Sequence, residues 1–121
     1  MCTADELAAA CSSTAASTYP YGDIYDSITC NGVDRASTAV VVATGSLATC
    51  ATPEGVLDLS GNLAEWTSTQ TNADAAPGRI FQLHGGSYLS PSTGLLCTME
   101  LAPRALEVTL LPNIGFRCCR E

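Results

Sequence analysis

The pattern of apolar and polar positions predicts few regular elements in this chain. Thr3, with Glu6 three residues later, is typical of a helix capping box, and the alanine-rich run that follows predicts one helix to about Cys11. The β-branched run at 40–43 predicts a short buried strand, and further strands are predicted at 79–84, 106–111 and 115–119. The polar segment 67–78 is expected to be a surface loop.

The stretch 55–66 carries the most distinctive local chemistry. It contains the only Trp and places two carboxylates, Asp58 and Glu65, on either side of a Ser-Gly-Asn turn. Gly61 and Asn62 supply the positive φ angles that a sharp turn requires. Carboxylates and loop carbonyls that converge on one point would form the oxygen-rich ligand set preferred by Ca²⁺. The spacing is not that of an EF-hand, so the residues alone favour a plain turn with Glu65 in solvent.

Composition narrows the classes of protein that fit. With 121 residues the chain is expected to form one small domain. It has no Lys, five Arg and a net charge of −7, so nucleic acid is not an expected partner. No apolar run approaches the roughly 20 residues of a membrane span. Seven cysteines indicate an oxidising, extracytoplasmic compartment, although no signal peptide follows Met1.

Several stretches carry a family resemblance. The segment 58–66 resembles the D-M-S-G-N-V-W-E-W motif of the formylglycine-generating enzyme (sulfatase-modifying factor) family. In the family's order, 1–7 resembles R-L-P-T-E-A-E-W, 19–22 resembles Y-P-W-G, 84–88 resembles R-G-G-S-W and 115–118 matches G-F-R-C. The resemblance implies an α+β, loop-rich, C-type-lectin-like fold with structural Ca²⁺. It also implies that 1–121 is a single domain lacking the family's N-terminal part, because the chain begins inside one motif.

The resemblance also implies two calcium sites. The first would use Asp58, Gly61, Leu63 and Glu65. The second would begin with Asn31 and Gly32, which are equally well explained as a plain Asn-Gly turn.

The copper chemistry of the family is not expected here. Family catalysts oxidise a cysteine of a sulfatase peptide to formylglycine, using O₂ and copper held by two thiolates, which suit Cu(I). Ser90 and Leu95 stand at the positions of those thiolates, and the nearest cysteine is Cys97. His84, the only histidine, replaces the Arg of R-G-G-S and is more readily explained as a packing residue than as a base or ligand.

The cysteines are expected to form structural disulfides. Cys30 with Cys50 would close one loop, and Cys97 with Cys118 or Cys119 would join an excursion to the last strand. Cys2 and Cys11 lie too far apart on one helix to pair, and one of them is expected to reach 118–119. An odd count leaves at least one thiol free or bonded between chains.

Three functions fit these observations. The first is a non-catalytic, Ca²⁺-stabilised scaffold of the family that binds a peptide, protein or glycan. The second is a copper-dependent, formylglycine-generating oxidase with a rearranged site, in which Cys97 and Cys118 or Cys119 hold the metal. The third is a truncated domain without independent function. The missing thiolates at 90 and 95 favour the first.

Overall fold

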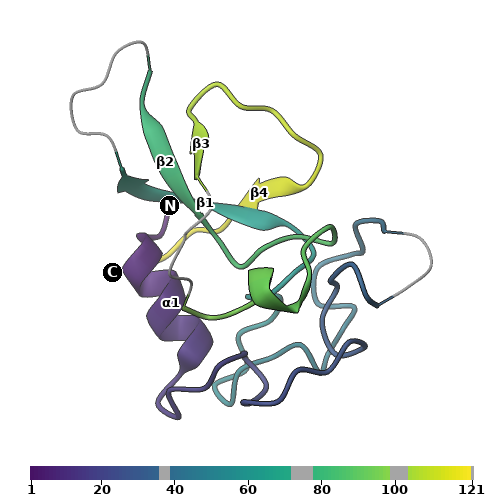
Figure 1. Ribbon diagram of the computed structural model, residues 1–121. Helices are drawn as coiled ribbons and strands as arrows, with labels where there is room; N and C mark the ends of the chain where they lie inside the picture. Colours follow the sequence, from purple (N-terminus) through teal and green to yellow (C-terminus); the bar gives the residue numbers. More distant parts are fainter. Residues whose placement is uncertain (36–38, 72–77, 99–103, 121) are drawn as a thin grey trace.

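The computed structural model describes residues 1–35, 39–71, 78–98 and 104–120. Its elements are one α-helix, a short 3-10 helix and a four-stranded sheet (Figure 1). Their bounds are α1 (Ala4–Ser12), β1 (Ala64–Gln70), β2 (Ile80–His84), η1 (Ser92–Gly94), β3 (Arg104–Leu106) and β4 (Ile114–Phe116). The predicted α+β class is confirmed.

Helix α1 begins with the predicted capping box. The Thr3 hydroxyl accepts from the Glu6 amide at 3.1 Å, and the Glu6 carboxylate accepts from the Thr3 amide at 2.6 Å. The pair satisfies two of the backbone donors that a helix start leaves free. The buried face of α1 carries Leu7 and Cys11, which pack in a core shared with Leu59. This packing fixes which side of the helix faces the interior.

The sheet has the order β3-β2-β1-β4. β1 pairs antiparallel with β2, β2 antiparallel with β3, and β1 parallel with β4. In the parallel pair Glu65 lies opposite Gly115 and Trp66 opposite Phe116. This register carries the residue after β4, Arg117, to the flank of Glu65.

Three predicted strands differ from the structure. The segment 40–43 is a loop, and Val40 and Val41 are about half exposed instead of buried. Its backbone groups at Val42 bond to the Asn62 side chain instead of a neighbouring strand. The prediction at 106–111 is wrong beyond Leu106, where a turn begins. The closing strand spans Ile114–Phe116, and β1 continues to Gln70 where a loop was expected; residues 72–77 of that expected loop lie outside the described residues.

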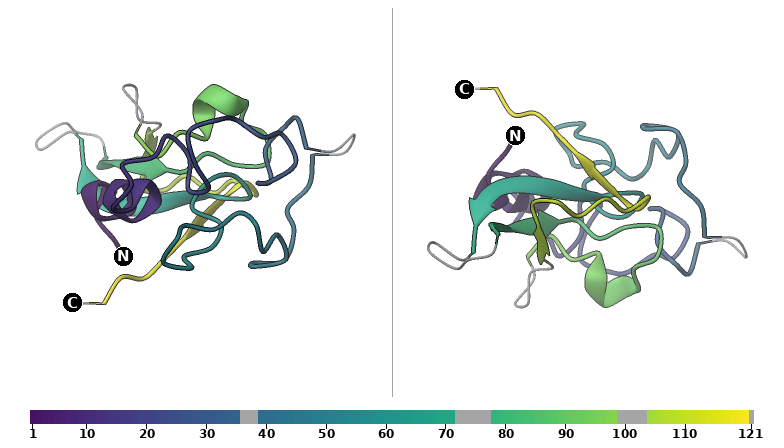
Figure 2. Two further views of the ribbon diagram at one scale, coloured as in Figure 1. Left: turned by 90° about the horizontal axis from the view of Figure 1, so that it is seen from below. Right: turned by 90° about the horizontal axis from the view of Figure 1, so that it is seen from above.

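Three disulfides cross-link the domain. They are Cys2–Cys119, Cys11–Cys97 and the predicted Cys30–Cys50, while Cys118 is free and exposed. As expected, one cysteine near the helix reaches the 118–119 pair, and the chain ends lie near each other in every view (Figure 2). The predicted pairing of Cys97 with Cys118 or Cys119 is wrong. The segment around Cys97 packs beside Cys11 in the core instead of beside the last strand.

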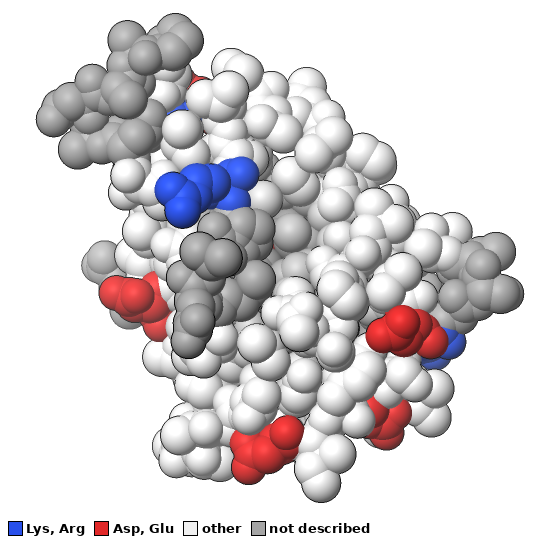
Figure 3. Space-filling view, in the orientation of Figure 1, with Lys and Arg blue, Asp and Glu red and all other residues white. Residues whose placement is uncertain are grey.

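The surface carries few charges. On the face shown in Figure 3 the acidic side chains are separated from one another and most of the surface is uncharged. None of the helices among the described residues has the length and apolar character needed to cross a membrane. The three disulfides are consistent with an extracytoplasmic protein.

Candidate functional site

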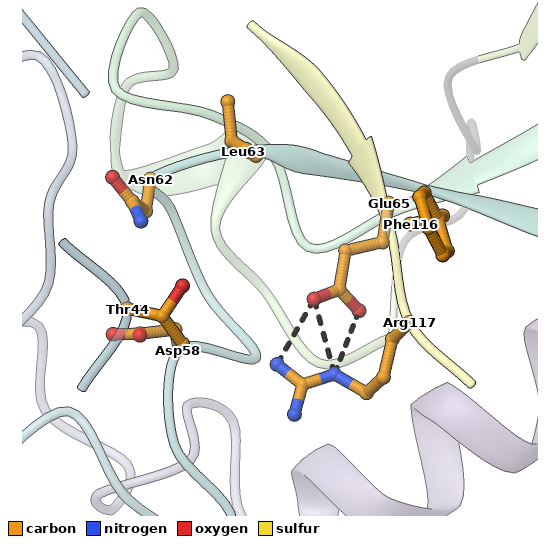
Figure 4. A pocket seen from close by; sticks show the side chains of 7 residues that line it. All are labelled: Thr44, Asp58, Asn62, Leu63, Glu65, Phe116 and Arg117. Atoms are coloured by element: carbon orange, nitrogen blue, oxygen red, sulfur yellow. Dashed lines mark hydrogen bonds and ion pairs between the residues drawn. The ribbon is translucent and has the colours of Figure 1, made fainter. Parts of the chain in front are cut away.

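A pocket of about 220 Å³ opens where the 44–63 loops meet the edge of the sheet. Its lining combines two carboxylates, one guanidinium, polar side chains and two apolar side chains (Figure 4). The lining residues are Thr44, Asp58, Asn62, Leu63, Glu65, Phe116 and Arg117. Since β1 supplies Glu65 and β4 supplies Phe116, the pairing of these strands positions that wall of the pocket.

Glu65 and Arg117 form a partly buried ion pair in this pocket. The Arg117 Nε lies 3.1 Å from both carboxylate oxygens, and its Nη2 lies 2.9 Å from Oε1. The same Nη2 donates to the Leu57 carbonyl at 2.8 Å. Burial raises the pKa of Glu65 above its ordinary value, the nearby Asp58 adds to this, and Arg117 opposes it. The pair thus joins β1, the residue after β4 and the loop before Asp58.

Asp58 is held in an uncommon backbone conformation. Its φ is 56°, in the left-handed region that few residues other than glycine and asparagine adopt. The residue is 7% exposed, and its Oδ2 accepts from the Gly45 amide at 2.6 Å. This bond fixes the carboxylate against the 44–45 turn, at the opposite side of the pocket from Arg117 (Figure 4).

Asn62 organises the loops below the pocket. Its φ is 63°, and its side chain both accepts from the Val42 amide and donates to the Val42 carbonyl. The side-chain amide of Asn31 also donates, from its Nδ2, to Asn62 Oδ1 at 3.0 Å. Gly61 packs so closely on Asn31 that an added Cβ would meet the Asn31 carbonyl oxygen. The Ser-Gly-Asn turn therefore holds the chain segments at Asn31 and Val42 together.

The residues of the first predicted calcium site are only partly brought together. Asp58, Leu63 and Glu65 line the pocket, whereas Gly61 lies against Asn31 and its amide donates to Gly85. Both carboxylate oxygens of Glu65 already accept from Arg117. The donor set fits Ca²⁺ poorly, because the ion would have to displace the guanidinium from Glu65. Calcium binding here stays a prediction.

Asn31 and Gly32, the residues of the second predicted calcium site, make hydrogen bonds within the loops, and calcium binding there stays a prediction. The Asn31 carbonyl accepts from the Asn62 amide, and its side chain donates to Val40 and Asn62. The Gly32 carbonyl accepts from the Arg35 amide. Among the residues that the structure describes, no three His, Cys, Asp or Glu side chains form a group that could hold a metal ion.

The expected copper positions do not offer two thiolates. Ser90 uses its hydroxyl to accept from the Ser87 amide at 2.9 Å, and Leu95 is a core side chain that is 2% exposed. Cys97 is fully buried and bonded to Cys11, so in this structure it offers no thiolate to pair with Cys118, and the rearranged oxidase stays an untested alternative. The residues present therefore do not fit Cu(I) held by a thiolate pair.

His84 is a buried packing residue. It is 6% exposed, its Nε2 lies 3.0 Å from the Cys97 carbonyl oxygen, and its Nδ1 has no hydrogen-bond partner in the described structure. Burial lowers the pKa of this imidazole below its usual 6.5, while the Cys97 contact partly opposes the shift.

We expect the domain to lose stability below about pH 6.5, the usual histidine pKa. Since the folded pKa is lowered, the unfolded chain binds a proton first, and stability falls as pH drops through the window below 6.5. Melting temperatures at pH 7.5 and 5.5 test this, with His84→Gln as the comparison because His84 is the only histidine. An equal decrease in both proteins would show that His84 is not responsible.

Four lining residues of the pocket were not predicted as site residues from the sequence. Thr44 carried no local signal, and Asn62 was predicted only as part of the turn. Phe116 and Arg117 were recognised only as parts of G-F-R-C, and the Arg117 partner Glu65 is 52 residues away. Opposite charges in two motifs of one resemblance were the available hint that these residues meet.

Comparisons with known proteins agree with this fold. The crystal structure of CarF superposes with a TM-score of 0.78 and 22% sequence identity, covering 96% of this chain and 45% of CarF. Treponema denticola variable protein 1 gives a TM-score of 0.73 and 14% identity, again with 96% and 45% coverage. The chain thus spans less than half the length of either protein, and these likenesses concern the fold alone. The predicted loop-rich, C-type-lectin-like architecture is confirmed.

Sequence comparison supplies the family. No curated protein sequence matches the chain. The family model described as sulfatase-modifying factor enzyme 1-like domain, in contrast, matches residues 1–121. Because this match covers the full chain, the protein belongs to the family of sulfatase-modifying factor enzyme 1-like domains.

Proposed function

We propose that this protein is a non-catalytic member of its family that binds a peptide, protein or glycan ligand. The observation that carries the proposal is the Cys11–Cys97 disulfide. Cys97, the cysteine nearest to the expected copper positions, is bonded in this disulfide and buried in the core. A serine and a buried leucine occupy those positions, and a hydroxyl is a poor ligand for Cu(I).

The pocket at Asp58 supports a binding role. The hydrogen bonds of the Asn62 side chain to the neighbouring loop and the Glu65–Arg117 ion pair hold its walls in place. Strained backbone at Asp58 persists only where surrounding contacts enforce it, and such positions cluster at binding and active sites. A rigid pocket with polar groups at fixed places and apolar walls is the usual form of a ligand site.

A peptide assay tests the absence of the family's reaction. The folded protein is incubated with a Cys-x-Pro-x-Arg peptide, copper, reductant and air, and the peptide mass is measured. We expect the cysteine to remain unchanged, because no thiolate pair is available at 90 and 95. A cooperative thermal transition of the same sample confirms that the protein is folded. Conversion of the cysteine to an aldehyde would overturn the proposal in favour of a rearranged oxidase.

A further inference from the structure

A groove separate from the pocket at Asp58 opens between two loops that are distant in the sequence. It has a volume of about 490 Å³ and lies between the segments 15–22 and 49–53, and we call it the Tyr21 groove. Apart from alanine and glycine, its lining consists of Ser17, Pro20, Tyr21, Thr49, Thr52 and Pro53. None of these side chains carries a charge, although the chain has a net charge of −7. The lining therefore favours an uncharged ligand.

Both walls of the Tyr21 groove are held by contacts within the chain. On one wall the backbone amides of Tyr19 and Gly22 each donate to the other's carbonyl, at 2.8 and 3.1 Å. On the other wall a disulfide anchors Cys50. The Ser13 hydroxyl donates to the Glu54 carboxylate at 2.6 Å, which joins the chain beside one wall to the chain beside the other. A ligand that enters this groove therefore has little loop ordering to offset.

The Tyr21 groove combines an aromatic ring with hydroxyl groups. The ring of Tyr21 stacks on Tyr19 with centroids 5.5 Å apart and planes at 10°, which fixes its orientation, and Tyr21 is only half-buried. Thr49 is exposed, and its hydroxyl makes no hydrogen bond to another described residue. The Ser17 hydroxyl donates to the Tyr19 carbonyl at 2.8 Å and keeps its lone pairs for a donor. An apolar ring face and polar groups of both kinds thus meet in one groove.

We propose that the Tyr21 groove binds a neutral sugar ring of a glycan. A pyranose has a face of C–H groups, which the negative face of the Tyr21 ring attracts. Its hydroxyls both donate and accept, so they can bond to Thr49 and Ser17. The groove volume lies within the roughly 300–1,000 Å³ of small-ligand sites. The inference rests on the proposed binding function, narrows its ligand to a glycan and places that ligand outside the pocket at Asp58.

Two features of the groove favour a neutral sugar over other ligands. Proline-rich peptides dock in grooves lined by several aromatic side chains, whereas Tyr21 is the only aromatic residue among the described residues of this lining. Asp23 and Glu54 directly follow the lining residues Gly22 and Pro53 in the chain, so carboxylates flank both walls. Their charge disfavours an anionic sugar.

Titration of the ¹⁵N-labelled protein with the methyl glycosides of glucose, galactose and mannose tests the proposal. We expect at least one of them to cause saturable shifts at the Gly22 and Thr49 amides and none at Gly45, whose amide donates to Asp58 outside the groove. The methyl glucuronide differs from the methyl glucoside by one carboxylate. It should bind at least about threefold more weakly than the glucoside, because carboxylates flank the groove.

Variants of the groove separate the ring contact from the hydroxyl contact. Tyr21→Leu should weaken binding about tenfold, whereas Tyr21→Phe keeps the ring and should bind as the wild type does. Thr49→Val removes an exposed hydroxyl at nearly constant volume and should weaken binding about fivefold. The matched control is Tyr25→Leu, which removes a ring that also packs on Tyr19, at 5.6 Å, but does not line the groove. It should leave binding unchanged.

Several results would overturn the inference. They are absent shifts with all three glycosides, shifts that both Tyr21→Leu and Thr49→Val leave unchanged, or equal weakening by Tyr21→Leu and Tyr25→Leu. The inference would also be overturned if a polyproline peptide shifted the same amides and the glycosides failed to compete. A cooperative thermal transition shows that each variant is folded. None of these results alters the outcome of the peptide-oxidation assay, so the glycan site and the non-catalytic assignment fail separately.

Discussion

Replacing both Cys11 and Cys97 with alanine is expected to lower the free energy of unfolding by about 4–5 kcal/mol. Chain entropy supplies about 3 kcal/mol of this loss, because Cys2–Cys119 still ties the segments outside the bridge together and limits the loop that is released. Both cysteines are fully buried beside Leu7 and Leu59, and the smaller side chains would also leave that core underpacked. A loss of this size is a large share of the roughly 5–15 kcal/mol by which native proteins are stable.

Urea denaturation of paired variants measures this effect. The matched control is Cys30→Ala with Cys50→Ala, which opens a loop of only 20 positions and is expected to cost about 3 kcal/mol. The Cys11/Cys97 variant should therefore have the lower midpoint, or fail to fold at 37 °C while the control variant folds. A Cys30/Cys50 variant whose urea midpoint is equal to or lower than that of the Cys11/Cys97 variant would contradict the assignment of Cys11–Cys97 as the principal cross-link of the core.

Local signals in the sequence were sufficient for the local parts of the fold. The capping box at Thr3 places the start of α1 because its two bonds lie within one helical turn. The turn at 60–62 follows equally from its own residues, since Gly61 and Asn62 adopt the positive φ that was expected of them. Asp58 and Glu65 consequently share one pocket, as their placement around this turn suggested.

Contacts between distant segments were less predictable. The β-branched run at 40–43 has the composition of a strand, yet its Val42 backbone finds its partner in the Asn62 side chain. Cys97 has six other cysteines as possible partners in the sequence, and only the packing of α1 selects Cys11. The ion pair of Glu65 depends on the parallel register of β1 and β4, which no local pattern specifies.

That ion pair is the source of the second large effect that we expect. Glu65→Gln should lower the free energy of unfolding by about 3–5 kcal/mol, because it leaves the Arg117 guanidinium partly buried without a counter-charge. The side chains of Glu65 and Arg117 are 12% and 27% exposed, so water can replace the carboxylate only in part. Chemical denaturation of the wild type and the variant at pH 7.5 gives this difference.

A second ion pair, between the residues that flank β2 and β3, provides the control. Arg79 and Glu107 lie 2.7 Å apart but are 63% and 33% exposed, so Glu107→Gln should cause no measurable change in stability. The double variant Glu65→Gln, Arg117→Gln should recover part of the loss, because it also removes the unpaired charge. The pair does not join β1 to β4 if Glu65→Gln lowers the free energy of unfolding no more than Glu107→Gln does. The same conclusion follows if the double variant loses as much free energy of unfolding as Glu65→Gln and Arg117→Gln lose together. The partial recovery, in contrast, would show that the structural role of Arg117 is to neutralise Glu65.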